Sequence, residues 1–354
     1  MAKKFFSPEI SVIIPMYNVE NFIGECLQSL LNQTFQNFEL IVVDDCSTDN
    51  SVKVVEDFSQ KFENRLTLLK LDKNSGVPGL PRNFGLNFAC GKYIYFLDSD
   101  DFIEPDTFEK FFEIAEKFSA DVVHSEKCLV QTEMNGEIKI EIASTQTGEF
   151  VNEPTLETFD IGERVQKFID KKFLWWGCNK LFRRKFLIDN KINFPNMTSY
   201  EDLIFCFQCV VCAKNYVRVP FVNYHYRIRG ESLSHKGIDA IESAKNLREA
   251  VRTLDDFMLG EDFFVENSQL RYAVIDFFAQ EILDKIAKNL FIANDFDTGE
   301  VYDFFERNIF SDKIGKNSAL TSYFFITTSL YKLLSQQQAN QIAELQKNLA
   351  KFQS

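Results

Sequence analysis

The sequence predicts an α/β protein with a doubly wound, mostly parallel sheet followed by a C-terminal helical region. Three observations lead to this prediction. Short apolar runs alternate with amphipathic segments over the first 130 residues, which is typical of repeated strand–helix units. The apolar runs are continuous, as expected of strands that helices cover on both faces. Acidic clusters follow these runs, at the strand ends where such sheets bind ligands.

Each predicted strand is a short apolar run, and each predicted helix carries apolar residues three or four positions apart. In chain order, the elements are a strand at 10–15, a helix at 19–33, a strand at 38–43, a helix at 49–62, a strand at 66–71, a helix at 81–89, a strand at 93–97, a helix at 105–118 and a strand at 121–124. Residues 125–160 are polar and predict a hairpin and loops, and the pattern beyond Gly237 is helical. We therefore predict two domains, at residues 1–236 and 237–354.

The charge balance argues against a nucleic-acid partner. The 354 residues include 52 acidic and 39 basic side chains, a net charge of −13, whereas nucleic-acid binders carry basic surfaces. The N-terminus has no apolar run long enough for a signal peptide, and no stretch of about 20 apolar residues predicts a membrane span. Eight cysteines without an export signal predict reduced thiols in a cytoplasmic protein.

Three cysteines, Cys206, Cys209 and Cys212, have the CxxCxxC spacing of some iron–sulfur ligands. They lie in an apolar stretch that reads as a helix, and no fourth cysteine is nearby. We interpret them as small apolar residues of a helix in the core.

The motif FLDSDD at residues 96–101 carries the sharpest chemical signal. Three carboxylates, on Asp98, Asp100 and Asp101, follow a buried strand and repel one another. A hard divalent cation removes that repulsion, and Mg²⁺ or Mn²⁺ held by one or two carboxylates commonly also binds substrate phosphates. The alternative is a helix N-cap followed by acidic residues in the first turn.

The ends of the first two strands suggest a base-binding site. Asp45, at the end of the second strand, has a carboxylate that can accept the imide N–H of uracil, and Tyr17 can stack on a base. The alternatives are an Asx-turn or helix cap for Asp44 and Asp45, and a tyrosine at the edge of the core.

Two further segments carry charged candidates. Arg82 opens a helix after the turn-rich loop 76–81, where helix N–H groups attract anions, although a solvated surface arginine has the same pattern. Glu201 and Asp202 precede an apolar helical run. A carboxylate there is either a general base or an acidic residue that favours the helix N-terminus.

Taken together, SVIIPMYN, VVDDCSTDNS, PRNFG, FLDSDD and YED, in that order, resemble glycosyltransferase family 2 with its GT-A fold. The resemblance is strong over residues 9–130 and extends to residue 235. It implies an inverting transferase that uses a nucleotide-diphospho-sugar, most simply a UDP-sugar, and Mn²⁺ or Mg²⁺.

The resemblance also implies roles for individual residues. Asp98 and Asp100 form the metal-binding pair, and Asp202 is the catalytic base that takes the acceptor's proton while one displacement inverts the anomeric carbon. The donor-binding set comprises Pro15, Tyr17, Asn18, Asp45, Arg82, Asn83, Asp98, Ser99, Arg229 and Ser232.

Two later segments extend the resemblance. WGCNKLFRR at 176–184 is similar to the family's W-x-K-L segment, and YHYRIRGESLSH at 224–235 is similar to the segment that closes over the diphosphate. There Arg227 is a further candidate, and either His225 or His235 completes the metal site.

The expected acceptor is a saccharide or lipid-linked saccharide of surface polysaccharide or glycoconjugate synthesis. Two rival functions are a sugar nucleotidyltransferase and a non-catalytic scaffold that binds nucleotide-sugars. A nucleotidyltransferase would show a Gly-rich basic loop after the first strand, which this sequence lacks. A scaffold would need no catalytic base, whereas this sequence has Asp202 as a candidate base. For the C-terminal helices we expect packing or a homo-oligomer, and we leave open a peripheral contact with the inner face of the membrane.

Overall fold

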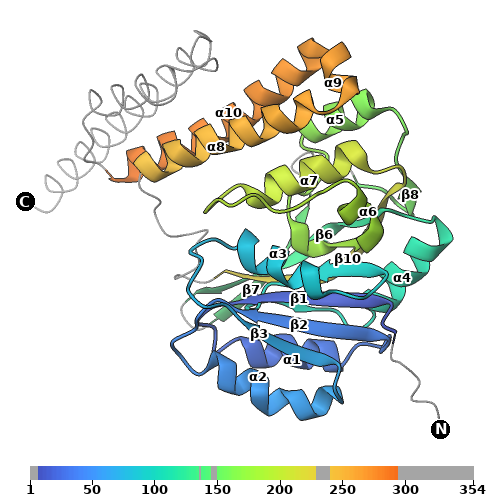
Figure 1. The fold of residues 1–354 in the computed structure, drawn as a ribbon, viewed down its shortest axis with the longest axis vertical. Helices are drawn as coiled ribbons and strands as arrows, with labels where there is room; N and C mark the ends of the chain where they lie inside the picture. The colour runs from blue at the N-terminus through green and yellow to red at the C-terminus, as the bar shows by residue number, and fades with distance from the viewer. Residues whose placement is uncertain (1–6, 135–136, 145–149, 229–239, 294–354) are drawn as a thin grey trace, which may run out of the picture. The chain divides into compact units, whose positions relative to one another are not determined.

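The computed structural model describes residues 7–134, 137–144, 150–228 and 240–293 (Figure 1). The chain divides into two compact units, Met1–His235 and Lys236–Ser354, and each is described by itself. The first unit is a mixed sheet with helices on both faces, so the predicted α/β class is confirmed.

The described strands of the first unit form one sheet in the order β3-β2-β1-β4-β9-β6-β10-β5, with β7 paired to β6 and β8 to β10. Their bounds are β1 Ile10–Met16, β2 Phe38–Asp44, β3 Leu66–Lys70, β4 Tyr93–Phe96, β5 Phe102–Ile103, β6 Val122–Met134, β7 Glu137–Ser144, β8 Thr155–Leu156, β9 Lys180–Arg183 and β10 Tyr216–Ile228. The helices are α1 Ile23–Leu31, α2 Ser51–Ser59, α3 Gly79–Phe88, α4 Thr107–Lys117, α5 Ile161–Ile169, α6 Arg184–Asp189 and α7 Glu201–Cys212.

Strands β3, β2, β1 and β4 are parallel neighbours, as the alternating pattern predicts. Beyond β4 the sheet is mixed, because β9 inserts antiparallel between β4 and β6, while β6 and β10 are parallel to each other. The sequence pattern did not show this insertion, since the short β9 is contributed by a segment far downstream. Because β1, β2 and β4 run in one direction, their carboxyl ends share one edge of the sheet.

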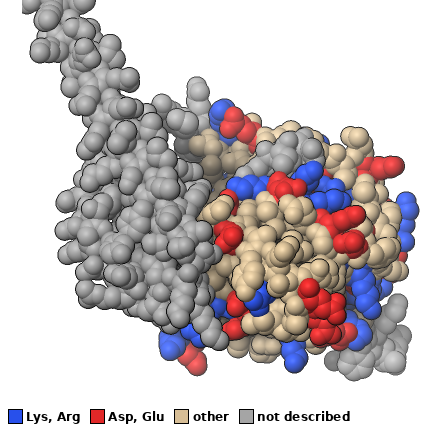
Figure 2. Space-filling model, turned by 90° about the horizontal axis from the view of Figure 1, so that it is seen from above, with Lys and Arg blue, Asp and Glu red and all other residues tan. Residues whose placement is uncertain are grey.

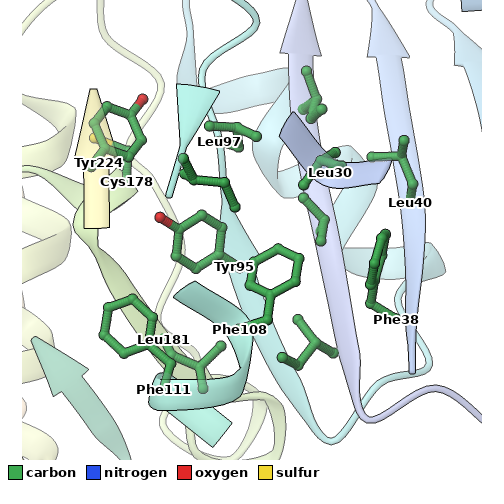
Figure 3. Close-up of a cluster of buried hydrophobic side chains, with 14 of the residues drawn as sticks. Leu30, Phe38, Leu40, Tyr95, Leu97, Phe108, Phe111, Cys178, Leu181 and Tyr224 are labelled. Carbon is green, nitrogen blue, oxygen red and sulfur yellow. The ribbon is translucent and has the colours of Figure 1, made fainter. Parts of the chain in front are cut away.

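Helices α1, α2 and α4 cover one face of this sheet through a continuous apolar cluster. Figure 3 shows that this cluster extends across the sheet, from Phe38 and Leu40 on β2 through Tyr95 on β4 to Leu181 and Tyr224. The parallel strands and the later strands therefore share one core, which fixes the later segments relative to the ends of β1, β2 and β4.

Helix α3 lies on the other face, and Gly85 permits its close approach. A Cβ at Gly85 would lie 2.6 Å from Cγ2 of Ile13 on β1 and 3.2 Å from Cγ2 of Val43 on β2. An alanine there would force the helix away from the sheet. This packing places the start of α3 at the carboxyl ends of the strands.

Helix α7 contains the CxxCxxC run. Cys206 and Cys209 are buried and Cys212 is half-buried, in agreement with the interpretation of a core helix. The predicted hairpin in residues 125–160 is also present, as β6 and β7.

The described part of the second unit consists of α8 Ala240–Leu259, α9 Asp262–Glu266 and α10 Ser268–Ala293. Val251, Leu254 and Met258 of α8 are buried, as their spacing predicts. Within the described ranges, the helices are all too short or too polar to cross a membrane. The predicted helix near the C-terminus, with Ile342, Leu345, Leu349 and Phe352, lies outside the described residues.

Candidate active site

The turns after β1 and β2 are tied to each other. Asn18, with a left-handed φ of 48°, accepts the main-chain N–H of Thr48 at 2.8 Å, and its own N–H donates to Ser47 Oγ at 3.1 Å. Tyr17 beside it is 48% exposed, and Pro15 is half-buried. The two strand ends are thus hydrogen-bonded into one platform that carries the exposed ring of Tyr17.

Asp44 and Asp45 have different structural roles. Asp44 Oδ1 accepts the N–H of Ser47, three residues on, at 3.1 Å, so this carboxylate stabilises the turn after β2 through a local side-chain to main-chain bond. The buried Asp45 carboxylate accepts the N–H and the hydroxyl of Ser75, each at 2.7 Å. Asp45 therefore holds the loop that leads into α3, and its proposed contact with a base would add to these bonds.

Arg82, on the first turn of α3, joins three carboxylates. Its guanidinium lies 2.8 Å from Asp98, 3.3 Å from Glu201 and 3.5 Å from Asp202, although the residue is only 6% exposed. The ring of Phe194 lies 5.1 Å from the guanidinium carbon. A solvated surface arginine is therefore excluded, and the predicted metal-binding carboxylate and the predicted base share one guanidinium.

Asn83 holds α3 against the segment before α7. Its amide donates to the carbonyl of Phe194 at 2.8 Å and accepts the N–H of Phe194 at 3.0 Å. A Cβ at Gly79 would lie 2.9 Å from the Cβ of Phe194, so the start of α3 is tightly packed there. Both polar groups of Asn83 are thus engaged with protein, and the predicted contact with the ribose or sugar stays a proposal.

The acidic residues after β4 divide into two groups. Asp98 and Asp100 are partly exposed, while Ser99 between them is buried. Asp101 is 1% exposed and accepts the Tyr224 hydroxyl at 2.6 Å and the Arg227 N–H at 2.8 Å. Burial, with the nearby Asp100 and Asp98 charges, raises the pKa of Asp101 well above its ordinary value. Asp101 thus fastens the strand end to β10.

Asp98 and Asp100 fit a divalent cation that phosphate oxygens help to hold. Two carboxylates at a strand end are the hard oxygen donors that Mg²⁺ or Mn²⁺ prefers, with substrate phosphates as the usual further ligands. Within the described ranges, there is no group of three or more His, Cys, Asp or Glu side chains placed to hold a metal.

Glu201 and Asp202 begin α7 after a strained residue, Tyr200, whose φ is 70°. Burial, with the adjacent Asp202 charge, raises the pKa of Glu201 to about 7. Burial also raises the pKa of Asp202, and Arg82 opposes that rise. The Asp202 side chain is 26% exposed and that of Glu201 is 10% exposed, so Asp202 is the more accessible carboxylate.

Gly177, just before β9, and Lys180, the first residue of β9, were not assigned a role from the sequence. The N–H of Gly177 hydrogen-bonds to Asp202 and lowers its pKa, and a Cβ at Gly177 would lie 3.2 Å from Asp202 Oδ1. The ammonium of Lys180 is fully buried and donates to the carbonyls of Leu174 (2.8 Å) and Trp176 and to Asn179 Oδ1 (2.9 Å). Lys180 thereby shapes the loop that faces Asp202.

The β10 candidates are held by protein groups. His225 Nε2 lies 2.7 Å from Glu104 Oε1, and its ring stacks on Phe102. The Arg227 side chain contacts the carbonyl of Asp100 and the carboxylate of Glu25. Arg229, Ser232 and His235 lie outside the described residues.

Acidic and basic side chains lie in small mixed groups on the face drawn in Figure 2. On this face, acidic side chains therefore lie beside basic ones and do not form one large acidic patch. The carboxylates of Asp98, Glu201 and Asp202 lie close together because each contacts the buried guanidinium of Arg82.

A comparison with protein families matches residues 11–190 to the family described as Glycosyl transferase family 2. Three curated relatives are each 32% identical. They are a poly(ribitol-phosphate) beta-glucosyltransferase of Bacillus spizizenii (64% of this chain, 33% of the relative), the putative glycosyltransferase EpsH of Bacillus subtilis (64% and 63%) and the poly(ribitol-phosphate) beta-N-acetylglucosaminyltransferase TarS of Staphylococcus aureus (72% and 41%). The chain thus spans between a third and just under two thirds of these relatives' lengths.

Solved structures show a similar fold. S. aureus TarS 1–349 aligns with 93% of this chain and 91% of its own, at 22% identity and a TM-score of 0.62. The same TarS fragment in complex with UDP-GlcNAc aligns with 91% and 80%, at 24% identity and a TM-score of 0.56. At these identities the likeness establishes the fold.

Proposed function

This chain belongs to glycosyltransferase family 2, and from that premise we propose that it transfers a sugar from a nucleotide-diphospho-sugar to a hydroxyl of a glycan or lipid-linked saccharide. The family model covers residues 11–190, which include the ends of β1, β2 and β4. The proposed transferase domain comprises residues 1–236, with residues 237–354 as a helical accessory domain.

The three carboxylates around Arg82 carry this proposal. Asp98 at the end of β4 and Asp202 at the start of α7 are far apart in the sequence, yet each pairs with the same buried guanidinium. A transferase needs its leaving-group site and its base within the length of one sugar. One guanidinium in contact with both supports that arrangement.

The donor is a UDP-sugar in this proposal. The TarS fragment was solved with UDP and with UDP-GlcNAc, and its fold is shared. The uracil would lie on the platform of Pro15, Tyr17, Asn18 and Asp45, which joins the ends of β1 and β2. Arg82, Asn83 and Ser99 would lie toward the ribose and sugar, and Arg229 and Ser232 toward the diphosphate.

Asp98 and Asp100 would hold Mn²⁺ or Mg²⁺ together with the diphosphate. When bound, such a cation neutralises the charge that develops on the leaving nucleotide diphosphate. Arg82 limits the mutual repulsion of Asp98, Glu201 and Asp202 and orients Asp98 through the 2.8 Å contact.

Asp202 is the proposed base because it is the more accessible of the two carboxylates on α7. Its oxygen would accept the acceptor hydroxyl's proton as that hydroxyl attacks the anomeric carbon from the face opposite the diphosphate. Its raised pKa makes this carboxylate a better proton acceptor than an ordinary aspartate. Glu201, more buried and also bound to Arg82, would position that guanidinium. A single displacement inverts the configuration.

The acceptor is proposed only as a class of molecule, from the names of the relatives. The relatives from B. spizizenii and S. aureus are named for poly(ribitol-phosphate), a surface polymer, so this polymer is the first acceptor to test. A cytoplasmic location, contact with the inner face of the membrane and a homo-oligomer formed through the C-terminal helices are further expectations.

Matched variants of the α7 carboxylates test the mechanism. A general base contributes about 10²–10⁴ in rate through the transition state, so Asp202→Asn should lower transfer by that order while the affinity for UDP-GlcNAc changes little. Glu201→Gln is the matched control and should lower transfer less. The measurements are radiolabelled transfer with Mn²⁺ and calorimetric donor binding.

Two outcomes would contradict the assignment. A larger loss in Glu201→Gln, with donor affinity preserved, would move the base to Glu201. If both variants kept wild-type activity, neither carboxylate would be the base, and both would serve only to stabilise the N-terminus of α7.

A further inference from the structure

The edge strand β7 presents an apolar face that the fold leaves exposed. Ile138, Ile140 and Ile142 are 66%, 52% and 62% exposed and lie two residues apart, so they share one face of the strand. Among the described residues, β7 pairs only with β6, so its outer edge offers main-chain donors and acceptors to another strand. Native proteins usually blunt such edges with charges, bulges or a covering element.

Lys139 and Glu141 lie on the opposite face of β7 and carry charges of opposite sign. Lys139 and Glu141 are ion-paired at 2.6 Å and are 64% and 62% exposed. A run of one sign would repel an approaching identical strand. A Lys and a Glu placed symmetrically about Ile140 have the opposite effect when the strand meets a copy of itself.

We propose that β7 is a homodimerisation edge, where two copies of the chain pair antiparallel about a twofold axis at Ile140. In this register Lys139 lies opposite Glu141 of the partner and Glu141 lies opposite Lys139 of the partner. Ile138 lies opposite Ile142 of the partner, and Ile140 lies opposite itself. Both exposed faces of the strand are thus complementary to their own copy, and opposite-charge and β-branched cross-strand pairs stabilise antiparallel sheets.

The neighbouring registers do not have this property. Directly opposite residues of an antiparallel pair point to the same face of the sheet. When the two strands are copies related by a twofold axis normal to the sheet, one residue must therefore lie opposite its own copy, and that residue marks the axis. An axis at Glu141 would place Glu141 opposite itself, and an axis at Lys139 would place Lys139 opposite itself. Like charges directly opposite are destabilising. An axis at Ile142 also avoids such contacts, but it pairs only residues 140–144 and places Glu141 opposite Ala143, whereas the axis at Ile140 pairs residues 137–143 and places Lys139 opposite Glu141.

The pairing would give a reversible dimer. Addition of one strand supplies main-chain hydrogen bonds along an edge, which is a common mode of recognition. An eight-residue strand is a short interface, however, and interfaces below about 1,200 Å² are typically weak and transient. We therefore expect the dimer fraction of the full chain to rise with protein concentration.

Charge reversal tests the interface. Sedimentation velocity of the full chain should show a monomer–dimer equilibrium. Lys139→Glu or Glu141→Lys alone should weaken the dimer about tenfold, because each introduces two like-charge contacts per dimer. The double variant Lys139→Glu with Glu141→Lys should restore it. These residues lie outside the proposed active site, so transfer should be unchanged.

Cysteine cross-linking tests the register, in a Cys90→Ser background because Cys90 is exposed. Opposite Cα atoms lie about 4.5–5.5 Å apart, which suits a disulfide, so Ile140→Cys should form a disulfide-linked dimer. Ile138→Cys should not, since its two copies would lie about 14 Å apart along the strand. A mixture of Ile138→Cys and Ile142→Cys proteins should cross-link.

Three results would overturn the proposal. The first is a monomer at every concentration. The second is a dimer whose strength is the same in Lys139→Glu and in wild type, which would place the contact elsewhere, including the C-terminal helices. The third is equal cross-linking through Ile138→Cys and Ile140→Cys.

Discussion

Replacing Arg82 by methionine would leave three carboxylates without their shared partner. Removal of one member of a buried ion pair typically costs about 3–5 kcal/mol, because the remaining charge stays desolvated. The side chains of Asp98 and Asp202 are each 26% exposed, so water can solvate them in part, whereas that of Glu201 is 10% exposed. We therefore expect Arg82→Met to lower the free energy of unfolding by about 3 kcal/mol near pH 8.

The loss of unfolding free energy in Arg82→Met should be larger at high pH than at low pH. Without Arg82, the pKa values of Glu201 and Asp202 rise further, because the guanidinium lowers both. Near pH 5 Glu201, whose pKa is about 7 even with Arg82 present, would be protonated and neutral, so the missing charge would matter less. The destabilisation relative to wild type should thus be smaller at about pH 5 than at about pH 8.

The assay is urea unfolding of the full chain followed by tryptophan fluorescence. The chain has two tryptophans, at 175 and 176, so the signal reports the first unit alone. Arg82→Lys is the control: it keeps the charge but loses the planar fork, and it should lose less stability. A loss below about 1 kcal/mol, or a loss that is the same at both pH values, would refute the reasoning.

Further predictions concern the metal ion, recognition of the nucleobase and the pH dependence of stability. Asp100→Ala should keep the fold but abolish metal-dependent transfer, and wild-type transfer that persists in EDTA would contradict the metal role. Calorimetry should show tighter binding of UDP than of GDP, with Asp45→Ala erasing the difference; equal wild-type affinities would remove Asp45 from that role. Because the folded-state pKa of Glu201 is raised from 4.5 to about 7, the native state binds more protons and wild-type stability falls as pH rises through that window. Glu201→Gln should be free of this contribution, so its unfolding free energy relative to wild type should rise over that pH range.

The sequence predicted what local patterns encode. Continuous apolar runs located β1, β2 and β4, and the acidic residues after them marked the edge where the candidate site lies. The helical reading of CxxCxxC was confirmed, since two of its cysteines are buried on α7.

Long-range geometry was not readable from one sequence. Arg82 and Glu201 are 119 positions apart, and their contact depends on α3 and α7 meeting at one edge. The insertion of β9 beside β4 also depends on tertiary packing.

Individual orientations were equally hidden. Asp98, Asp100 and Asp101 form one acidic cluster in the sequence, yet Asp101 turns inward to Tyr224 while Asp98 pairs with Arg82. Lys180 was noted only as part of the WGCNKLFRR segment, yet its ammonium is fully buried and donates to carbonyls of the loop that faces Asp202. Nothing in the local pattern distinguishes these cases, because burial is decided by neighbouring elements.

The most direct test of the central claim is the anomeric outcome of donor turnover. Wild-type protein with Mn²⁺ and α-linked UDP-GlcNAc is followed by proton NMR, with poly(ribitol phosphate) and with water alone as acceptors. Inversion through Asp202 predicts a β-configured product, or the β-anomer of the free sugar before it equilibrates. An α-configured first product, or no consumption of the donor under either condition, would contradict the account.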